Sequence, residues 1–280
     1  MAVRERGLAG RIHVWARREE ARRECVAQSW CDAVFETPEA ACAGSDLTVV
    51  CAPVDAIPDL AARAATAMPA GGLVTDVGST KARLVAAARA GMPAGCCFIG
   101  SHPMAGSEKQ GLAHASSDIF PGRACLVTPV GDEPPAVLSR LLRFWDGLGM
   151  RTVTVAPDEH ERIVAAVSHL PHAAAASICS WLDAKPRNWL GCMGGGLRDT
   201  TRIAAGSPEL WRGIFAENRD EVVAALDGLV AHLSSLRDHL AAGDDAAVLA
   251  FLQRAKACRD EFPILPAPSA LPDAAPSRKA

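Results

Sequence analysis

Short apolar runs alternate with longer, helix-like stretches through the first half of the chain. Six runs of four to six residues have the continuous apolar character of strands buried on both faces. They are residues 11–15, 46–51, 72–77, 97–100, 124–127 and 151–155. This alternation predicts an α/β domain over residues 1–155, in which helices cover both faces of a mostly parallel sheet.

The pattern changes after Ala156, where strand-like runs give way to helical ones. Pro157 followed by Asp158 and Glu159 indicates a helix start, because proline fits the first turn and acids there interact well with the helix dipole. Apolar residues recur at helical spacing over 218–240, a stripe suited to packing on a partner. We therefore predict an all-helical domain over 156–262, followed by a disordered, proline-rich tail over 263–280.

Composition excludes several classes of protein. The 280 residues are 49% hydrophobic and 22% charged, as in a soluble globular protein with about two domains. The formal charge of -3 gives no basic field for nucleic acid. Ten cysteines without a C-x-x-C pair, most of them in apolar runs, favour buried, reduced thiols over zinc or disulfides, so no metal is expected. Without a signal-like start or a long uncharged apolar stretch, we expect a cytoplasmic protein that does not contact a membrane.

The first candidate for chemistry is His102, in the run GSHPMAGSE over residues 100–108. We expect it in a loop just beyond the carboxyl end of a strand, where open α/β sheets bind ligands. An imidazole with an ordinary pKa of about 6.5 can transfer protons at neutral pH. The alternative is a loop histidine that bonds only to nearby backbone.

Two further segments lie in the helical half. Ser168 and His172 share a helix face, and Pro171 between them should kink the helix; polar residues at a kink also serve only the helix itself. The run GGGLRDTTRIAAGSPELW over 194–211 places two arginines near hydroxyls, a combination suited to bidentate carboxylate binding. A surface ion pair of Arg198 with Asp199 is the alternative.

A fourth segment, DVGSTK over residues 76–81, follows a strand and opens a helix. Ser79 and Thr80 can cap that helix, or the same geometry can present a hydroxyl to a ligand.

The strings GSHPMAGSE, SHLPH and GGLRDTTRIAAGSPELW, in this order, resemble the prephenate/arogenate dehydrogenases of tyrosine biosynthesis. The likeness runs from about Arg4 to about Phe262. It implies a Rossmann-type nicotinamide domain, a helical domain that forms a homodimer, and NAD(P)-dependent oxidative decarboxylation of prephenate to 4-hydroxyphenylpyruvate.

The resemblance also implies roles for individual residues. His102 matches the catalytic histidine that takes the proton of the ring hydroxyl, and Ser79 matches a serine that touches that hydroxyl and the nicotinamide. The substrate-binding positions implied are Arg202, which grips a carboxylate, with Asp199, Ser168, His172, Glu108 and Trp211.

The sequence departs from the family at two places. No G-x-G-x-x-G loop precedes Arg4, and residues 1–8 look like the second half of the helix that should follow such a loop. The missing strand would be central and would leave two unpaired sheet edges, so we expect that Met1 is an internal methionine; a chain that truly starts there should bind dinucleotide weakly.

The second departure concerns the cofactor. Where NAD-preferring members carry an acid for the ribose, this chain has Ala16, followed by Arg17 and Arg18, which favours the 2′-phosphate of NADP over NAD. The cofactor-binding candidates are Arg17, Arg18, Pro53 and Ser79.

Three alternatives stay open at this point. The substrate could be arogenate, or the chain could be an inactive remnant of the family. A 3-hydroxy-acid dehydrogenase shares the domain order, but such enzymes rely on a lysine in the helical domain, and Lys185 is the only one between residues 110 and 255.

Overall fold

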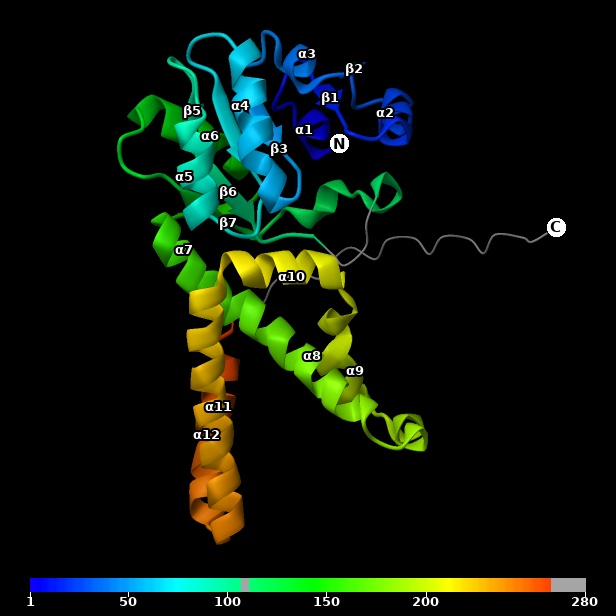
Figure 1. Ribbon diagram of the computed structural model, residues 1–280, viewed down its shortest axis with the longest axis vertical. Helices are drawn as coiled ribbons and strands as arrows, with labels where there is room; N and C mark the ends of the chain where they lie inside the picture. Colours follow the sequence, from blue (N-terminus) through cyan, green and yellow to red (C-terminus); the bar gives the residue numbers. More distant parts are fainter. Residues whose placement is uncertain (107–110, 263–280) are drawn as a thin grey trace, which may run out of the picture. The chain divides into compact units, whose positions relative to one another are not determined.

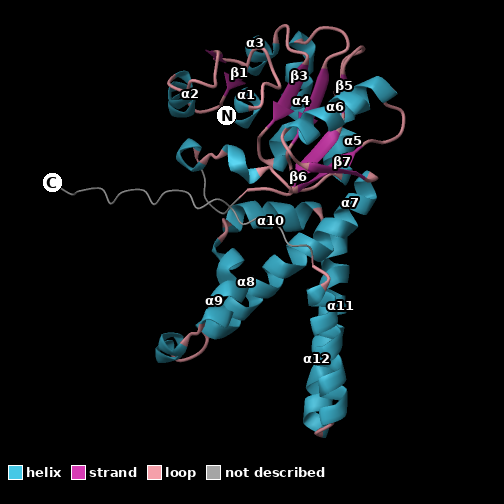
Figure 2. Cartoon of the chain, turned by 180° about the vertical axis from the view of Figure 1, so that it is seen from behind, coloured by secondary structure: helices cyan, strands magenta, loops and turns pink. Residues whose placement is uncertain are grey.

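The computed structural model describes residues 1–106 and 111–262. The chain divides into two compact units, one over Met1–His160 and a second that begins at Glu161. All described strands belong to the first unit, and the second is helical (Figure 2). The predicted fold class is therefore confirmed.

The strands of the first unit form three hydrogen-bonded groups. A parallel pair is made by β1 (His13–Trp15) and β2 (Ala33–Phe35). A parallel sheet is made, in this order, by β3 (Leu47–Val50), β4 (Leu73–Asp76) and β5 (Cys97–Phe98). In the third group, β7 (Ala124–Thr128) lies between antiparallel β6 (Gly100–Pro103) and parallel β8 (Arg151–Thr154).

Helices connect these strands, as the alternating pattern predicts (Figure 1). The α-helices of the first unit are α1 (Ala2–Glu5), α2 (Glu19–Val26), α3 (Pro38–Cys42), α4 (Ile57–Ala67), α5 (Ala82–Ala90), α6 (Pro135–Gly147) and α7 (Pro157–Val164), whose last residues belong to the second unit. Its 3-10 turns are η1 (Val54–Ala56), η2 (Leu112–His114) and η3 (Ser117–Ile119).

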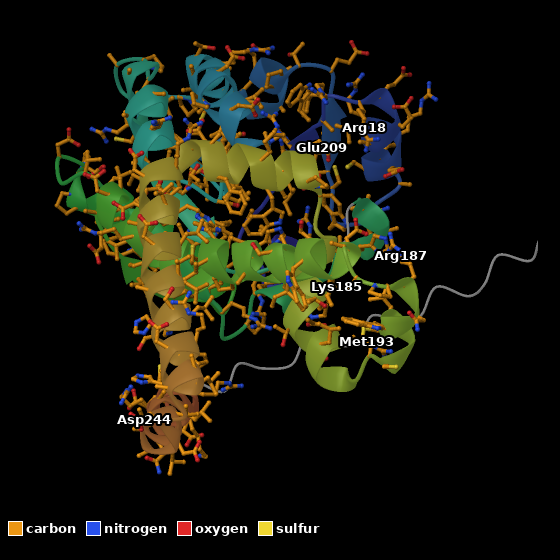
Figure 3. The ribbon with its side chains drawn as sticks, turned by 60° about the horizontal axis from the view of Figure 1, so that its bottom comes forward. Arg18, Lys185, Arg187, Met193, Glu209 and Asp244 are labelled. Carbon is orange, nitrogen blue, oxygen red and sulfur yellow. The ribbon has the colours of Figure 1, made fainter. Side chains whose placement is uncertain are left out.

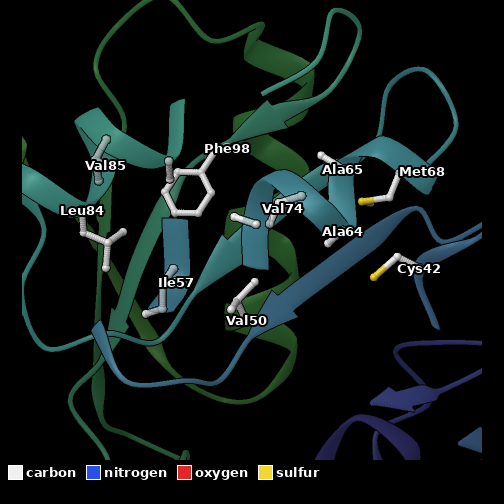
Figure 4. Packing of buried hydrophobic residues seen from close by; sticks show 12 residues of the cluster. Cys42, Val50, Ile57, Ala64, Ala65, Met68, Val74, Leu84, Val85 and Phe98 are labelled. Atoms are coloured by element: carbon white, nitrogen blue, oxygen red, sulfur yellow. The ribbon is translucent and has the colours of Figure 1, made fainter. Parts of the chain in front are cut away.

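Strand β4 is buried on both faces and separates two hydrophobic clusters. Because side chains alternate along a strand, Val74 packs into one cluster with Ile57 and Phe98 (Figure 4), and Leu73 packs into the other with Leu141. Because both faces of these strands are buried, their sequences are continuous apolar runs, and the end of each run marks the end of a strand.

The second unit starts within a long helical run. The π-helical turn η4 (Ala165–His169) interrupts it between α7 and α8 (Leu170–Asp183). The remaining elements are η5 (Arg187–Cys192), α9 (Gly195–Thr201), η6 (Arg202–Ala205), α10 (Pro208–Glu217), α11 (Arg219–Ala242) and α12 (Asp245–Asp260). Helices α11 and α12 lie side by side as a hairpin, whose turn has Gly243 at a φ of 64° and Asp244 as the N-cap of α12 (Figures 1 and 3).

Several details correct the expectations from sequence. His102 lies inside strand β6, not in a loop, and β6 runs antiparallel to its neighbour. Strand β2 was not predicted. The break expected at Pro171 is the π-turn directly before it. Of the ten cysteines, all free, only Cys42 and Cys125 are buried. The tail over 263–280 lies outside the described residues.

Two observations concern the expected missing strand and the expected lack of a membrane-spanning segment. Strands β1 and β3 are edges of separate sheets in the described part of the first unit. The helical run Pro157–Asp183 has an 18-residue window with a mean hydropathy of 1.3, enough by length and composition to cross a membrane, although core helices of soluble proteins have the same character.

Candidate functional site

Three of the predicted site residues lie beyond the carboxyl ends of strands β3, β4 and β5. Strands β3, β4 and β5 are parallel, so their carboxyl ends lie together. Pro53 follows β3 and Ser79 follows β4. Ile99 extends β5 through a hydrogen bond to Val74, and the chain then enters β6 with His102. The topology therefore places these three residues where α/β proteins bind ligands.

A buried ion pair fixes this edge. Asp76 and Lys81 both have fully buried side chains, and their Oδ2 and Nζ atoms are 2.7 Å apart. Lys81 also donates to the carbonyls of Gly78 and Thr80, at 2.7 and 2.9 Å. Asp76 accepts from the backbone N–H of Gly78 at 2.7 Å and from that of Ser101 at 3.0 Å. One carboxylate thus ties the turn that carries Ser79 to the strand that carries His102.

The turn over residues 78–80 does not cap helix α5. The N-cap position is Lys81, and among the described residues no side-chain capping bond to this helix is seen from Ser79 or Thr80. The expectation that Ser79 or Thr80 caps the helix is therefore wrong. The Thr80 hydroxyl is buried without a hydrogen-bond partner among the described residues. Gly78 is needed in this turn, because a Cβ there would lie 2.8 Å from Asp76 Oδ2.

His102 is 9% exposed, and its Nδ1 lies 3.0 Å from Nε2 of His160, which is fully buried at the start of α7. Beside this strand, burial raises the pKa of Cys125 to about 12, so the thiol stays protonated at neutral pH. The Cys125 thiol is therefore not available as a base here, and the predicted proton-transfer group of this region is His102. Sequence reasoning missed His160 because nothing in its helical surroundings connects it with a residue 58 positions earlier.

A second cluster lies in the helical unit, where two predicted residues meet. The rings of His172 and Trp211 stack with centroids 3.6 Å apart and an angle of 11° between their planes. The edge of His169 meets Trp211, and Asn218 Nδ2 lies 3.2 Å from His169 Nδ1 while donating to the Glu161 carbonyl at 2.9 Å. Asn218 and His169, which sequence reasoning missed, therefore support the stacked pair.

A cavity of about 710 Å³ borders the stacked pair. Burial lowers the pKa of His172, which keeps its imidazole neutral, and its Nδ1 has no hydrogen-bond partner among the described residues. The lining is mostly apolar or aromatic, with two cationic groups: His172, Trp211, Phe215, Val222, Arg212 and Arg219 are among its residues. Such a surface can receive an aromatic or cyclic anion.

The other predicted substrate residues do not line this cavity. Arg202 is exposed at the start of η6, and Asp199 is exposed on α9. Ser168 is half-buried within the π-turn η4. Glu108 lies outside the described residues.

Arg17 and Arg18 follow the carboxyl end of β1 and are exposed (Figure 3 labels Arg18). Arg22 Nη1 donates to the carbonyls of Ala16 and Arg17, at 2.7 and 3.1 Å, and so holds this turn. Two guanidinium groups on a braced turn can bind a phosphate. Over the described ranges, no cluster of three His, Cys, Asp or Glu residues could hold a metal ion.

Comparison with known proteins identifies the family of the chain. Residues 1–154 match the family described as the nucleotide-binding domain of prephenate dehydrogenase, and residues 156–254 match its dimerization domain. Prephenate dehydrogenase of Bacillus subtilis is 32% identical over 195 residues, 69% of this chain and 53% of that protein. Cyclohexadienyl dehydrogenase of Zymomonas mobilis is 29% identical over 219 residues, 77% and 74% of the two chains. The chain thus spans about half the length of the first relative and three quarters of the second.

Solved structures give the same fold. Prephenate dehydrogenase from Aquifex aeolicus, in complex with hydroxyphenyl propionate and NAD+, superposes with a TM-score of 0.85 at 27% identity, over 93% of this chain and 92% of that one. Arogenate dehydrogenase from Synechocystis shares the fold, with a TM-score of 0.80 at 22% identity.

The buried ion pair yields a first prediction. Lys81→Met should lower the free energy of unfolding by about 3–5 kcal/mol, because it leaves the Asp76 carboxylate buried without its counter-charge. Urea denaturation measures this. Arg63→Met, which removes an exposed ion pair with Glu39, is the matched control and should change stability little. Adding Asp76→Asn to Lys81→Met should recover part of the lost stability, because no buried charge then remains. Equal stability of the Lys81→Met and Arg63→Met variants would contradict the prediction.

The stacked pair yields a second prediction. Trp211→Ala should raise the pKa of His172 toward its ordinary value, because burial is what lowers it. Proton NMR of the imidazole Cε1–H during a pH titration measures this, with the signal assigned by its loss in His172→Gln. Because the folded state disfavours protonation of His172, the free energy of unfolding should decrease as the pH falls below the pKa that this side chain has in the unfolded chain. Trp181→Ala, at an exposed tryptophan, should leave the titration unchanged.

Proposed function

The chain belongs to the prephenate dehydrogenase family, and from this premise we propose that it oxidatively decarboxylates prephenate to 4-hydroxyphenylpyruvate in tyrosine biosynthesis. The observation that carries the proposal is the link through Asp76, which joins the Ser79 turn and the His102 strand at the carboxyl edge of the sheet. This link supports an assignment in which the His102 imidazole and the Ser79 hydroxyl act on the same substrate hydroxyl.

The chemistry assigned to His102 is removal of the ring hydroxyl proton. As the C–H electron pair leaves as hydride, the O–H proton passes to His102, and the bond to the ring carboxylate breaks to release CO2. The phenolic oxygen regains a proton when the ring becomes aromatic, so no net proton is lost from the hydroxyl. A positioned imidazole typically contributes about 10²–10⁴-fold to such a step. Ser79 orients the hydroxyl.

Substrate binding is assigned to the helical unit. Arg202 grips a carboxylate through a bidentate hydrogen bond, and Asp199 is its neighbour on the preceding helix. His172 and Ser168 supply polar contacts, and Trp211 forms an apolar wall for the ring. The neutral, hydrogen-bond-ready Nδ1 of His172 supports this role. Glu108 is assigned, from family likeness alone, to the mouth of the pocket.

A bound nicotinamide dinucleotide would supply the hydride acceptor. Pro53 and Ser79 would face it from the carboxyl ends of β3 and β4, while Arg17 and Arg18 would bind its adenosine end. The braced pair of exposed guanidinium groups fits a 2′-phosphate, which favours NADP over NAD.

We further propose that the enzyme is a cytoplasmic homodimer. Large apolar side chains are exposed along the α11–α12 hairpin, and such surfaces on a folded protein indicate an interaction site. They are Val223, Val230, Leu233, Leu240, Leu249 and Leu252.

Turnover tests the function. With prephenate and either cofactor, reduced nicotinamide should accumulate at 340 nm. His102→Asn should lower kcat by about 10²–10⁴-fold, and Arg202→Gln should raise KM for prephenate by at least about tenfold, because it loses a charged hydrogen bond. Arg187→Gln, at an exposed arginine on η5, is the control and should behave like the parent. Turnover of arogenate alone would move the assignment to the arogenate enzyme, and turnover of neither would identify an inactive relative.

Cofactor choice is tested separately. Replacing both Arg17 and Arg18 by serine should raise KM for NADP by about tenfold or more and leave KM for NAD within about twofold, since only NADP carries the 2′-phosphate. Steady-state kinetics with both cofactors provides the comparison. A parent enzyme that prefers NAD strongly would refute the preference for NADP.

A further inference from the structure

We infer that His160 is a positioning residue, which holds His102 in the tautomer that can accept a proton. The inference rests on the proposed role of His102 as the base. His160 contacts His102, to which the proposed function assigns the reacting proton, so the role inferred for His160 is indirect.

The geometry supports a directed hydrogen bond between the two rings. His102 Nδ1 and His160 Nε2 are 3.0 Å apart, and the ring centroids are 5.2 Å apart with planes at 52°. His102 lies on β6 and His160 on α7, both within the first unit. His160 is fully buried and His102 nearly so. Water therefore competes little for this bond.

Two neutral imidazoles can share one hydrogen bond in only two ways. If His160 Nε2 carries the proton, His102 Nδ1 is the acceptor and His102 Nε2 must be protonated, which makes it useless as a base. If His102 Nδ1 carries the proton, His160 Nε2 accepts it and His102 Nε2 keeps its lone pair. Removal of a hydroxyl proton requires the second arrangement.

Burial of His160 favours this arrangement over the charged alternative. A protonated His160 would donate from Nε2 and force His102 to be the acceptor. Full burial penalises the charged imidazole and so favours a neutral His160, whose Nε2 can act as the acceptor. The same acceptor then holds the Nδ1–H of His102 after Nε2 has taken a proton. This is the role that a carboxylate plays for histidine in hydrolase triads, here assigned to a neutral ring.

The test compares two substitutions that differ in reach. The Oε1 of His160→Gln is as many bonds from Cβ as Nε2 is and can accept the same hydrogen bond. His160→Asn is also polar but ends one bond earlier and cannot reach His102. Nitrogen-15 NMR of histidine-labelled protein reports the tautomer directly, with the His102 signals assigned by their loss in His102→Asn.

The parent and His160→Gln should show His102 protonated at Nδ1, and His160→Asn should shift it toward protonation at Nε2. In parallel, kcat should fall by about 10- to 100-fold in His160→Asn, with KM within about threefold, and should recover largely in His160→Gln. His13→Gln, a histidine of the same unit that lies against the Ala41 carbonyl, should change neither quantity.

An unchanged His102 tautomer in His160→Asn would overturn the inference, as would equal loss of kcat in both His160 variants. Failure of the proposed function looks different. Full activity of His102→Asn would remove the base assignment, while the tautomer measurement, which needs no turnover, would still report whether His160 controls the ring.

Discussion

A carboxylate and an ammonium group buried together impose the main constraint on the first unit. Neither Asp76 nor Lys81 reaches solvent, so the cost of removing both charges from water must be offset by their mutual attraction and by hydrogen bonds. Within the described residues, these bonds go to the backbone of a short turn and to the second residue of β6. The chain around the proposed catalytic groups can therefore move little without leaving a charge unsatisfied.

The helical unit meets a similar demand without paired charges. Its cluster is built from rings that stack or meet edge to face, and from one asparagine that bridges a helix junction to the π-turn. Desolvation keeps His172 neutral, so the substrate carboxylates that we assign to this unit would meet hydrogen-bond donors and an apolar wall, with positive charge left to the arginines. We thus propose proton removal for residues of the first unit and recognition of an anion for residues of the second.

Sequence patterns predicted most strands of the first unit, because a strand that is buried on both faces appears as a continuous apolar run. The strands of the central sheet are continuous apolar runs, and Pro53 and Ser79 follow the carboxyl ends of two of them. Strand β2 was missed because three apolar residues between polar ones are too few for such a run. His102 was expected in a loop because the predicted strand ends at Gly100, yet antiparallel pairing with β7 makes the segment a strand. Partners such as His160, Lys81 and Asn218 depend on contacts between distant segments, which no local pattern encodes.

The π-turn at Ala165–His169 has a consequence for how this helix can evolve. A π-turn accommodates one more residue than the α-helix needs, so the cheapest repair, deletion of a single residue, would restore regular hydrogen bonding. The residues of the turn itself would be displaced, among them His169, whose Nδ1 lies 3.2 Å from Asn218 Nδ2. The widened turn thus sets the positions of Ser168 and His169, and a single-residue deletion there would change a contact of the ring cluster.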